Sequence, residues 1–395
     1  MARQRIFRHV ARLCAAFALA AAGAAAADPA LLFDWQTERC DRWDIPDAPA
    51  RFWRDASGQV HMLAGNEANR ESVGPDLRHL EHVCRLVHAG AEDPDPAARN
   101  DRVWIVSVFT RDGVRIEALG HAEYHGHRHG RACAADDYMS CWRNAIVALE
   151  SDDGGRSFTR VPGPPVAALP YRYDRDQSRR SGYFNPSNMI VAGDHLYFYF
   201  FAEAYGVQRR GVCLARRKLD GGPADWRGWD GQDFSIRFAD PYAPGLTEPE
   251  RHVCTPLPGL TAPLNSIVRQ PATGRYLAVS PMVAEIDGTR TVGFWAFTST
   301  DLIHWRDRVL LAPMPLLWAR DCADSYAHAY ASLVDPDSGS RTFETVGTRF
   351  WLTLVRMSLD AKCRVGPERD LIRFDVSWPA QADAPPTVRA PRADR

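Results

Sequence analysis

The sequence predicts an all-β fold, a β-propeller made of repeated four-stranded antiparallel blades. At Ser151–Phe158 a turn of the form Ser-x-Asp-x-Gly-x-Ser-aromatic joins two β-prone runs, and such a pattern is typical of a hairpin. Weaker copies of the turn recur about 70 to 80 residues apart, with aspartates at Asp76, Asp153, Asp225 and Asp301. A long repeat of strand-rich units with one turn signal each is typical of propellers.

Two of these turns resemble those of known propeller families. Ser151–Phe158 resembles the Asp-box of sialidases and related β-propellers. Ser299–Trp305, which reads Ser-Thr-Asp-Leu-Ile-His-Trp, is similar to the blade turn of secreted arabinanases, xylosidases and invertases. Those enzymes are five-bladed glycoside hydrolases, so the resemblance implies five blades and action on a carbohydrate.

The first 27 residues have the features of a signal peptide. Four arginines precede an apolar, Ala-rich run, and Ala25–Ala27 offers a cleavage site. The run is too short and too Ala-rich for a good membrane anchor. We expect an exported protein, periplasmic or secreted, with a single propeller over residues 28–378 and a disordered tail over residues 379–395.

Charge and composition exclude some functions. Without the first 27 residues the chain has four fewer of its 48 basic residues and keeps all 49 acidic ones, a net charge of about −5. No basic block of the nucleic-acid-binding type is present. We therefore expect a monomer that binds neither nucleic acid nor membrane stably.

Cysteine usage agrees with export. Of nine cysteines, Cys14 lies in the signal segment, and an even number remains in the mature chain, which predicts disulfides. Cys133 and Cys141 are close enough to close one loop. The sequence does not fix the other pairs, and our hypothesis joins neighbours: Cys40–Cys84, Cys213–Cys254 and Cys322–Cys363.

Strand order predicts which carboxylates meet. In an antiparallel blade the first strand starts, and the second ends, at the same face, so polar residues at these positions gather at one mouth of the central channel. Asp47 stands at the start of the first blade, and Glu123 and Glu203 stand at the ends of second strands. The resemblance implies that Asp47 is the base or nucleophile of a glycosidase. Glycoside hydrolysis needs a second carboxyl group, and we favour Glu123 over Glu203 as the acid because Tyr124 and His125 adjoin it.

The same positions predict the substrate-binding residues, and we expect no cofactor and no metal. Histidines alternate at His121, His125, His127 and His129, but alternation in a loop does not fix a tetrahedral cage. The predicted substrate-binding residues are Tyr124, His125, Arg143, Tyr183, Asn185, Asn188, Tyr326, His328 and Arg356.

Two departures from the arabinanase-like pattern leave alternatives open. Asn185 stands where those enzymes have an Asp, and Ala262–Ser266 has no Glu where they have their acid. A carbohydrate-binding propeller without catalysis is therefore the first alternative. A sialidase-like exo-glycosidase is the second, and it needs clustered arginines, for which Arg51, Arg143 and Arg356 are the candidates.

Overall fold

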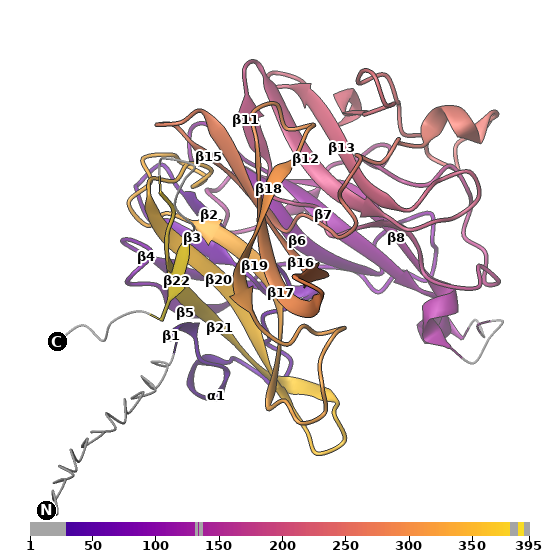
Figure 1. Cartoon of the computed structure of the whole chain (residues 1–395). Helices are drawn as coiled ribbons and strands as arrows, with labels where there is room; N and C mark the ends of the chain where they lie inside the picture. The colour runs from indigo at the N-terminus through magenta and orange to yellow at the C-terminus, as the bar shows by residue number, and fades with distance from the viewer. Residues whose placement is uncertain (1–28, 131–132, 134–136, 380–385, 391–395) are drawn as a thin grey trace, which may run out of the picture.

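The structure is a computed structural model that describes residues 29–130, 133, 137–379 and 386–390. The predicted signal peptide lies outside the described residues, as does most of the predicted tail. Strands dominate the described chain (Figure 1), with one short α-helix, α1 (Trp35–Glu38), and four 3₁₀ turns. None of the helices in the described part has the length and apolar character needed to span a bilayer.

The strands form antiparallel groups in chain order, which we name sheets I to V. Sheet I contains β2 (Arg51–Arg54), β3 (Val60–Leu63), β4 (Ala68–Gly74) and β5 (Glu81–Ala89). Sheet II contains β6 (Arg102–Phe109), β7 (Ile116–His125), β8 (Trp142–Ser151) and β9 (Thr159–Arg160). Sheet III contains β10 (Ser181–Phe184), β11 (Ile190–Ala192), β12 (His195–Ala202), β13 (Gly211–Lys218) and β14 (Arg227–Gly228).

Sheet IV contains β15 (Ser266–Gln270), β16 (Arg275–Ile286), β17 (Thr289–Ser299) and β18 (Arg306–Pro313). Sheet V contains β19 (Tyr326–Val334), β20 (Arg349–Leu359) and β21 (Val365–Ser377), together with β1 (Ala30–Phe33) and β22 (Thr387–Arg389). A short parallel pairing between β8 and β10 joins sheets II and III into one nine-stranded network. The remaining pairs within the sheets are antiparallel.

The two ends of the described chain meet on one edge of sheet V (Figure 1). β1 pairs with β21 at Leu371–Arg373, and β22 pairs with the same strand at Asp375–Ser377. The predicted disordered tail is therefore ordered at β22, because the free edge of β21 supplies backbone partners for it. The first strand of the chain completes the last sheet and closes the fold.

Hydrogen bonds connect the sheets in a closed ring. In each case a polar side chain in a strand, or next to one, bonds to the backbone of the neighbouring sheet or of the segment leading into it, at 2.7 to 3.1 Å. The bonded pairs are Asn69–Val103, Ser107–Met189, Asn188–Ile267, Ser266–Leu333 and Ser332–Ala50. Apolar clusters fill the same interfaces between consecutive sheets, for example Trp53 with Ile105 and Phe198 with Ile146. The prediction of an all-β propeller of four-stranded antiparallel sheets is confirmed.

The repeated aspartate turns occupy equivalent places in four sheets. Asp76, Asp153, Asp225 and Asp301 each lie in the connection that leads into the last strand of sheets I, II, III and IV, respectively. In the strongest copy the Ser151 hydroxyl donates to Asp153 at 2.7 Å, and the Ser157 amide donates to the same carboxylate at 3.0 Å. The hairpin predicted for Ser151–Phe158 joins β8 to β9.

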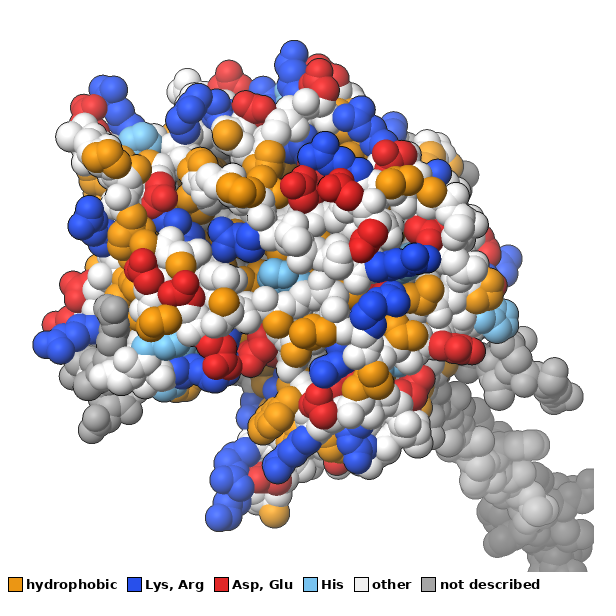
Figure 2. Space-filling model, turned by 180° about the vertical axis from the view of Figure 1, so that it is seen from behind, with side chains coloured by type: hydrophobic (Ala, Val, Ile, Leu, Met, Phe, Trp, Pro, Cys, Tyr) orange, Lys and Arg blue, Asp and Glu red, His pale blue; other side chains and the backbone are white. Residues whose placement is uncertain are grey.

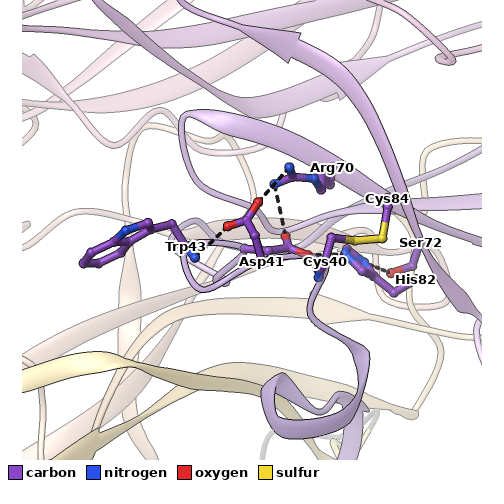
Figure 3. Close-up of a disulfide and its surroundings, with 8 residues drawn as sticks. Cys40, Asp41, Trp43, Arg70, Ser72, His82 and Cys84 are labelled. Carbon is purple, nitrogen blue, oxygen red and sulfur yellow. Dashed lines mark hydrogen bonds and ion pairs between the residues drawn. A yellow bond between two sulfur atoms is a disulfide. The ribbon is translucent and has the colours of Figure 1, made fainter.

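The four proposed disulfides are confirmed: Cys40–Cys84, Cys133–Cys141, Cys213–Cys254 and Cys322–Cys363. The first one ties the segment before sheet I to β5 (Figure 3). Beside it, Arg70 of β4 forms an ion pair with Asp41 at 2.9 Å. These contacts hold the chain that leads directly into Asp47.

Candidate functional site

A cavity of about 690 Å³ opens at the mouth of the channel, within the range of ligand sites in proteins. All five sheets, or the segments that lead into them, contribute to its walls. Asp47 and Glu123 are the carboxylates among the described residues that line it. Figure 2 shows that elsewhere on one face of the molecule acidic and basic side chains are interspersed.

Asp47 is held by groups from distant parts of the chain. Its backbone amide donates to the carbonyl of Ala64 at 2.9 Å. Arg369 of β21 forms an ion pair with its carboxylate, and the Tyr330 hydroxyl hydrogen-bonds to it. Burial raises the pKa of Asp47; Arg369 opposes the rise, and the negative charge of Glu123 adds to it. The carboxyl thus lies deep in the protein, although its side chain remains 22% exposed to the cavity.

Glu123 lies between two histidines on one face of β7. Side chains two residues apart on a strand share a face, so His121, Glu123 and His125 point the same way. His125 Nε2 lies 2.8 Å from one oxygen of Glu123, and His121 Nδ1 lies 3.7 Å from the other. Burial lowers the pKa of His121, while Glu123 raises it. The two imidazoles fix the orientation of the carboxyl.

Glu67 is a third carboxyl in the same electrostatic neighbourhood. Burial raises its pKa to about 7, and the charges of Glu123 and Asp47 act in the same direction. The positive charge of Arg128 opposes this rise of the pKa, and Arg102 forms an ion pair with Glu67 at 2.9 Å. The interaction among the three carboxyls shows that Asp47, Glu67 and Glu123 lie close enough to influence each other's protonation.

Aromatic rings form the wall next to Glu123. The Trp142 ring stacks on His125 at 5.1 Å and contacts the edge of Phe184 at 5.4 Å. Trp104 and Tyr138 also line the cavity. Flat apolar faces beside carboxyl groups provide surfaces on which a ring-shaped ligand can stack.

Two non-glycine residues of the wall have left-handed backbones. Tyr330 has φ 58° and Asn185 has φ 49°. Tyr330 lies where the pairing of β19 with β20 shifts register, and this irregularity brings its hydroxyl to Asp47. Strained backbone of this kind concentrates at functional sites.

Glu203 does not reach the cavity. Its side chain is completely buried, and three arginines bind its carboxylate. Arg179 Nη2 lies at 3.1 Å, Arg180 Nη2 at 2.8 Å and Arg210 Nε at 3.0 Å. Two of these arginines, Arg180 and Arg210, line the cavity in front of it. The structure therefore does not bring Glu203 together with Asp47 and Glu123.

Of the predicted substrate-binding residues, Asn185 and His328 line the cavity, and His125 lies directly behind Glu123. His328 Nδ1 lies 3.2 Å from the carbonyl oxygen of Pro315. Burial lowers the pKa of His328.

The other predicted substrate-binding residues lie elsewhere, and each has a structural partner. Tyr124 and Tyr183 are buried, with hydroxyls bonded to Pro94 and Gln208. Asn188 bonds to the backbone of Ile267 in sheet IV. Arg143 bonds to Gln177. Arg356 pairs with Asp370 and lies over the ring of Tyr326, the last member of this group.

The arginines considered for a sialidase-like site do not gather. Arg51 is buried in the channel and donates to the carbonyls of Val106 and Asn265 at 2.6 and 2.7 Å. Burial lowers its pKa to about 9. Arg51, Arg143 and Arg356 are absent from the described lining of the cavity.

Sequence reasoning missed several residues of the wall. Tyr330 and Arg369 lie inside apolar or mixed strands of the last sheet, and nothing local marks them. Arg180 and Arg210 flank strands of sheet III, and Trp318, 60% exposed, stands at the mouth. The sequence did offer one signal for the arginines of the wall, since they occur in two adjacent pairs, Arg179–Arg180 and Arg209–Arg210.

The alternating histidines have separate partners. His129 Nε2 lies 3.1 Å from Asp101, while His127 is exposed. Among the described residues, two groups of three side chains have possible metal-ligand atoms within 4.8 Å of one another. Both groups include disulfide-bonded cysteines, which offer no thiolate.

Comparison with solved structures finds similar chains at low sequence identity. The chain is similar to an α-L-arabinanase from Cellvibrio cellulosa complexed with arabinohexaose, with 10% identity over 87% of this chain and 95% of that one and a TM-score of 0.49. It is also similar to an exo-1,5-α-L-arabinanase from a bovine ruminal metagenomic library (11% identity, 88% and 99% coverage, TM-score 0.49). A putative exo-β-1,3-galactanase from Bifidobacterium bifidum s17 matches with 12% identity, 88% and 98% coverage and a TM-score of 0.45.

The sequence matches no family model and no curated protein. In the cavity itself, two interacting carboxyl groups, Asp47 and Glu123, lie among aromatic rings and arginines.

Proposed function

We propose that the protein is a glycoside hydrolase and that the cavity is its active site. The observation that carries the proposal is the sharing of one sugar-sized cavity by Asp47 and Glu123, whose charges interact. A pair of carboxyl groups, one protonated and one ionised, is the machinery of most glycosidases. Mutual repulsion between two carboxylates favours that singly protonated state.

The environment of each carboxyl suits a different role. Arg369 and Tyr330 favour the anionic form of Asp47 against the burial that raises its pKa, and the anion attacks the anomeric carbon or removes a proton from the attacking water. Glu123 gives its proton to the glycosidic oxygen as the bond to the anomeric carbon breaks. Since burial raises the pKa of Asp47, the acidic limb of the activity profile should lie above the usual carboxylate range.

The rest of the wall suits a carbohydrate. Aromatic rings such as Trp142 and Phe184 can stack on the apolar face of a sugar. Asn185 and Asn265 add amide side chains to the same wall. Sugar hydroxyls offer matching acceptors and donors.

Substitution of the carboxyl groups tests the proposal. On a panel of neutral and acidic oligosaccharides, we expect Asp47→Asn and Glu123→Gln each to lower the turnover rate by about 10² to 10⁴. Glu150→Gln is the matched control, because Glu150 lies on β8 outside the cavity and pairs with Arg115 at the surface. Circular dichroism and thermal unfolding check that all three variants fold. Wild-type rates in both cavity variants would place the chemistry elsewhere.

A binding protein without catalysis is the second candidate. The observation in its favour is that sheets III and IV contribute Asn185 and Asn265 to the wall, where amides can bind a sugar but cannot ionise. Glycan binding by the wild-type protein, with no turnover on the whole panel and no loss of binding in Asp47→Asn, would support it.

We also propose that the protein is exported without residues 1–27. Four disulfides in one chain support an oxidising compartment. Mass spectrometry of the exported protein should show a mature chain that gains eight hydrogens on reduction, two for each disulfide. Retention of the leader, or free thiols in the denatured, unreduced protein, would contradict this.

A further inference from the structure

Three arginines converge on the single buried carboxylate of Glu203. Arg179, Arg180 and Arg210 together make four N–H···O contacts with it, at 2.8 to 3.1 Å. The cluster holds three positive charges and one negative charge. One cation is enough to compensate one buried carboxylate, so charge compensation does not explain the other two.

The surplus charge faces the cavity. Arg180 and Arg210 line it, whereas Glu203 lies behind them. Arg180 uses Nε and Nη2 on the carboxylate, and Arg210 uses Nε. Among the described residues no acceptor is bonded to Nη1 of Arg180 or to either Nη of Arg210. These N–H groups remain available to a ligand.

Aromatic rings fix the planes of both guanidinium groups. Arg180 lies over Phe184 at 4.8 Å and over Trp142 at 5.4 Å, and Arg210 lies over Phe201 at 4.8 Å. A guanidinium held between a carboxylate and a ring is oriented before any ligand arrives. Arginine forks of this kind match the geometry of carboxylate and sulfate oxygens.

The arginines also adjoin the proposed catalytic groups. Trp142 touches Arg180 on one side and His125, the partner of Glu123, on the other. The positive charge of Arg180 lowers the pKa of His121. One face of the cavity is therefore cationic and the adjoining face carries the carboxyl groups.

We propose that Arg180 and Arg210 bind the anionic group of an acidic glycan, a sugar carboxylate or a sulfate ester, next to Asp47 and Glu123. This inference deepens the proposed function and rests on it. Glu203 acts as a positioning residue that holds the two arginines in place.

The test compares matched variants and matched glycans. Arg210→Gln and Arg180→Gln each remove one cation from the wall. Arg209→Gln is the control, because Arg209 is the exposed neighbour of Arg210, does not line the cavity and loses the same charge. Affinity is measured by titration calorimetry on uronic-acid oligosaccharides and their carboxyl-reduced forms, and on sulfated oligosaccharides and their desulfated forms.

We expect the wild-type protein to bind an acidic form more tightly than its neutral counterpart, and increasing salt to reduce that preference. Arg210→Gln and Arg180→Gln should weaken binding of the acidic form about 10- to 100-fold. They should leave binding of the neutral form nearly unchanged, and Arg209→Gln should match wild type. Whether the carboxylated or the sulfated pair shows the preference identifies the anion.

Equal binding of acidic and neutral forms overturns this inference and leaves the proposed function intact. The same holds if the preference persists in Arg180→Gln and Arg210→Gln. Absence of binding and turnover for every glycan, neutral and acidic, overturns the proposed function and this inference together.

Discussion

Replacement of Glu203 by Gln tests how the wall of the cavity is held together. Gln keeps the size of the side chain and removes its charge. The four contacts from Arg179, Arg180 and Arg210 then lose their ionic partner. Three like charges remain close together, and the amide offers one acceptor oxygen in place of two.

The expected cost is about 3 kcal/mol. Removal of one partner from a buried ion pair typically destabilises a protein by about 3–5 kcal/mol. Glu203 is completely buried, but Arg179 and Arg210 are about half exposed, at 53% and 51%. Water therefore recovers part of their loss, and the lower end of the range applies. With about 2.1 cal/mol/K of unfolding entropy per residue, a chain of this size should lose roughly 4 °C of Tm.

Urea unfolding followed by tryptophan fluorescence, together with a thermal scan, measures this change. Glu150→Gln provides the control, because the surface pair of Glu150 with Arg115 should contribute less than about 1 kcal/mol. A Glu203→Gln protein within 1 kcal/mol of wild type would refute the reasoning, since it would mean that the arginines do not depend on the carboxylate.

Two further predictions concern a turn and pH. Gly155→Ala should destabilise the protein by about 2–4 kcal/mol, because φ at Gly155 is +103° and an added Cβ would lie 2.3 Å from the Trp53 ring. Gly163→Ala is the control: φ is +126° there, but an added Cβ would meet nothing within 4 Å, so it should cost only about 1 kcal/mol. Equal losses of stability in urea unfolding would contradict this prediction. Burial raises the pKa of Glu67 to about 7 from 4.5, so the folded state keeps a proton that the unfolded state loses between these values, and stability should fall as pH rises through this window. Because Glu67 is 33% exposed and paired with Arg102, we expect Glu67→Gln to reduce that fall by on the order of 1–2 kcal/mol between pH 4.5 and 8, and an unchanged pH dependence would count against it.

The fold was predictable because its signals are local and repeated. Asp153 and its copies lie in turns whose side chains bond to the backbone a few residues away, and such turns form wherever the short pattern occurs. The contacts that close the ring are different in kind. β1 pairs with β21, which lies more than 300 residues away in the sequence, and no local sequence pattern indicates that pairing.

The site was predictable only to the level of strand ends. Strand order correctly placed Asp47 and Glu123 at one cavity. It could not tell which of two adjacent residues on a strand points toward that cavity. Tyr124 lies on the opposite face of β7 from Glu123, and Tyr183 lies on the opposite face of β10 from Phe184. Alternation along a strand gives this distinction in principle, once the register of one residue is known.

Charge around a strand end is set by the chain that packs beside it. Glu123 lies near the end of β7, and Glu203 directly follows the end of β12. Histidines of β7 flank Glu123, whereas three arginines from two segments surround Glu203. The arginine-lined position turns a carboxylate into a structural anchor, and the cations in front of it become the groups that a ligand meets. Similar positions in a repeated fold thus acquire opposite electrostatic environments.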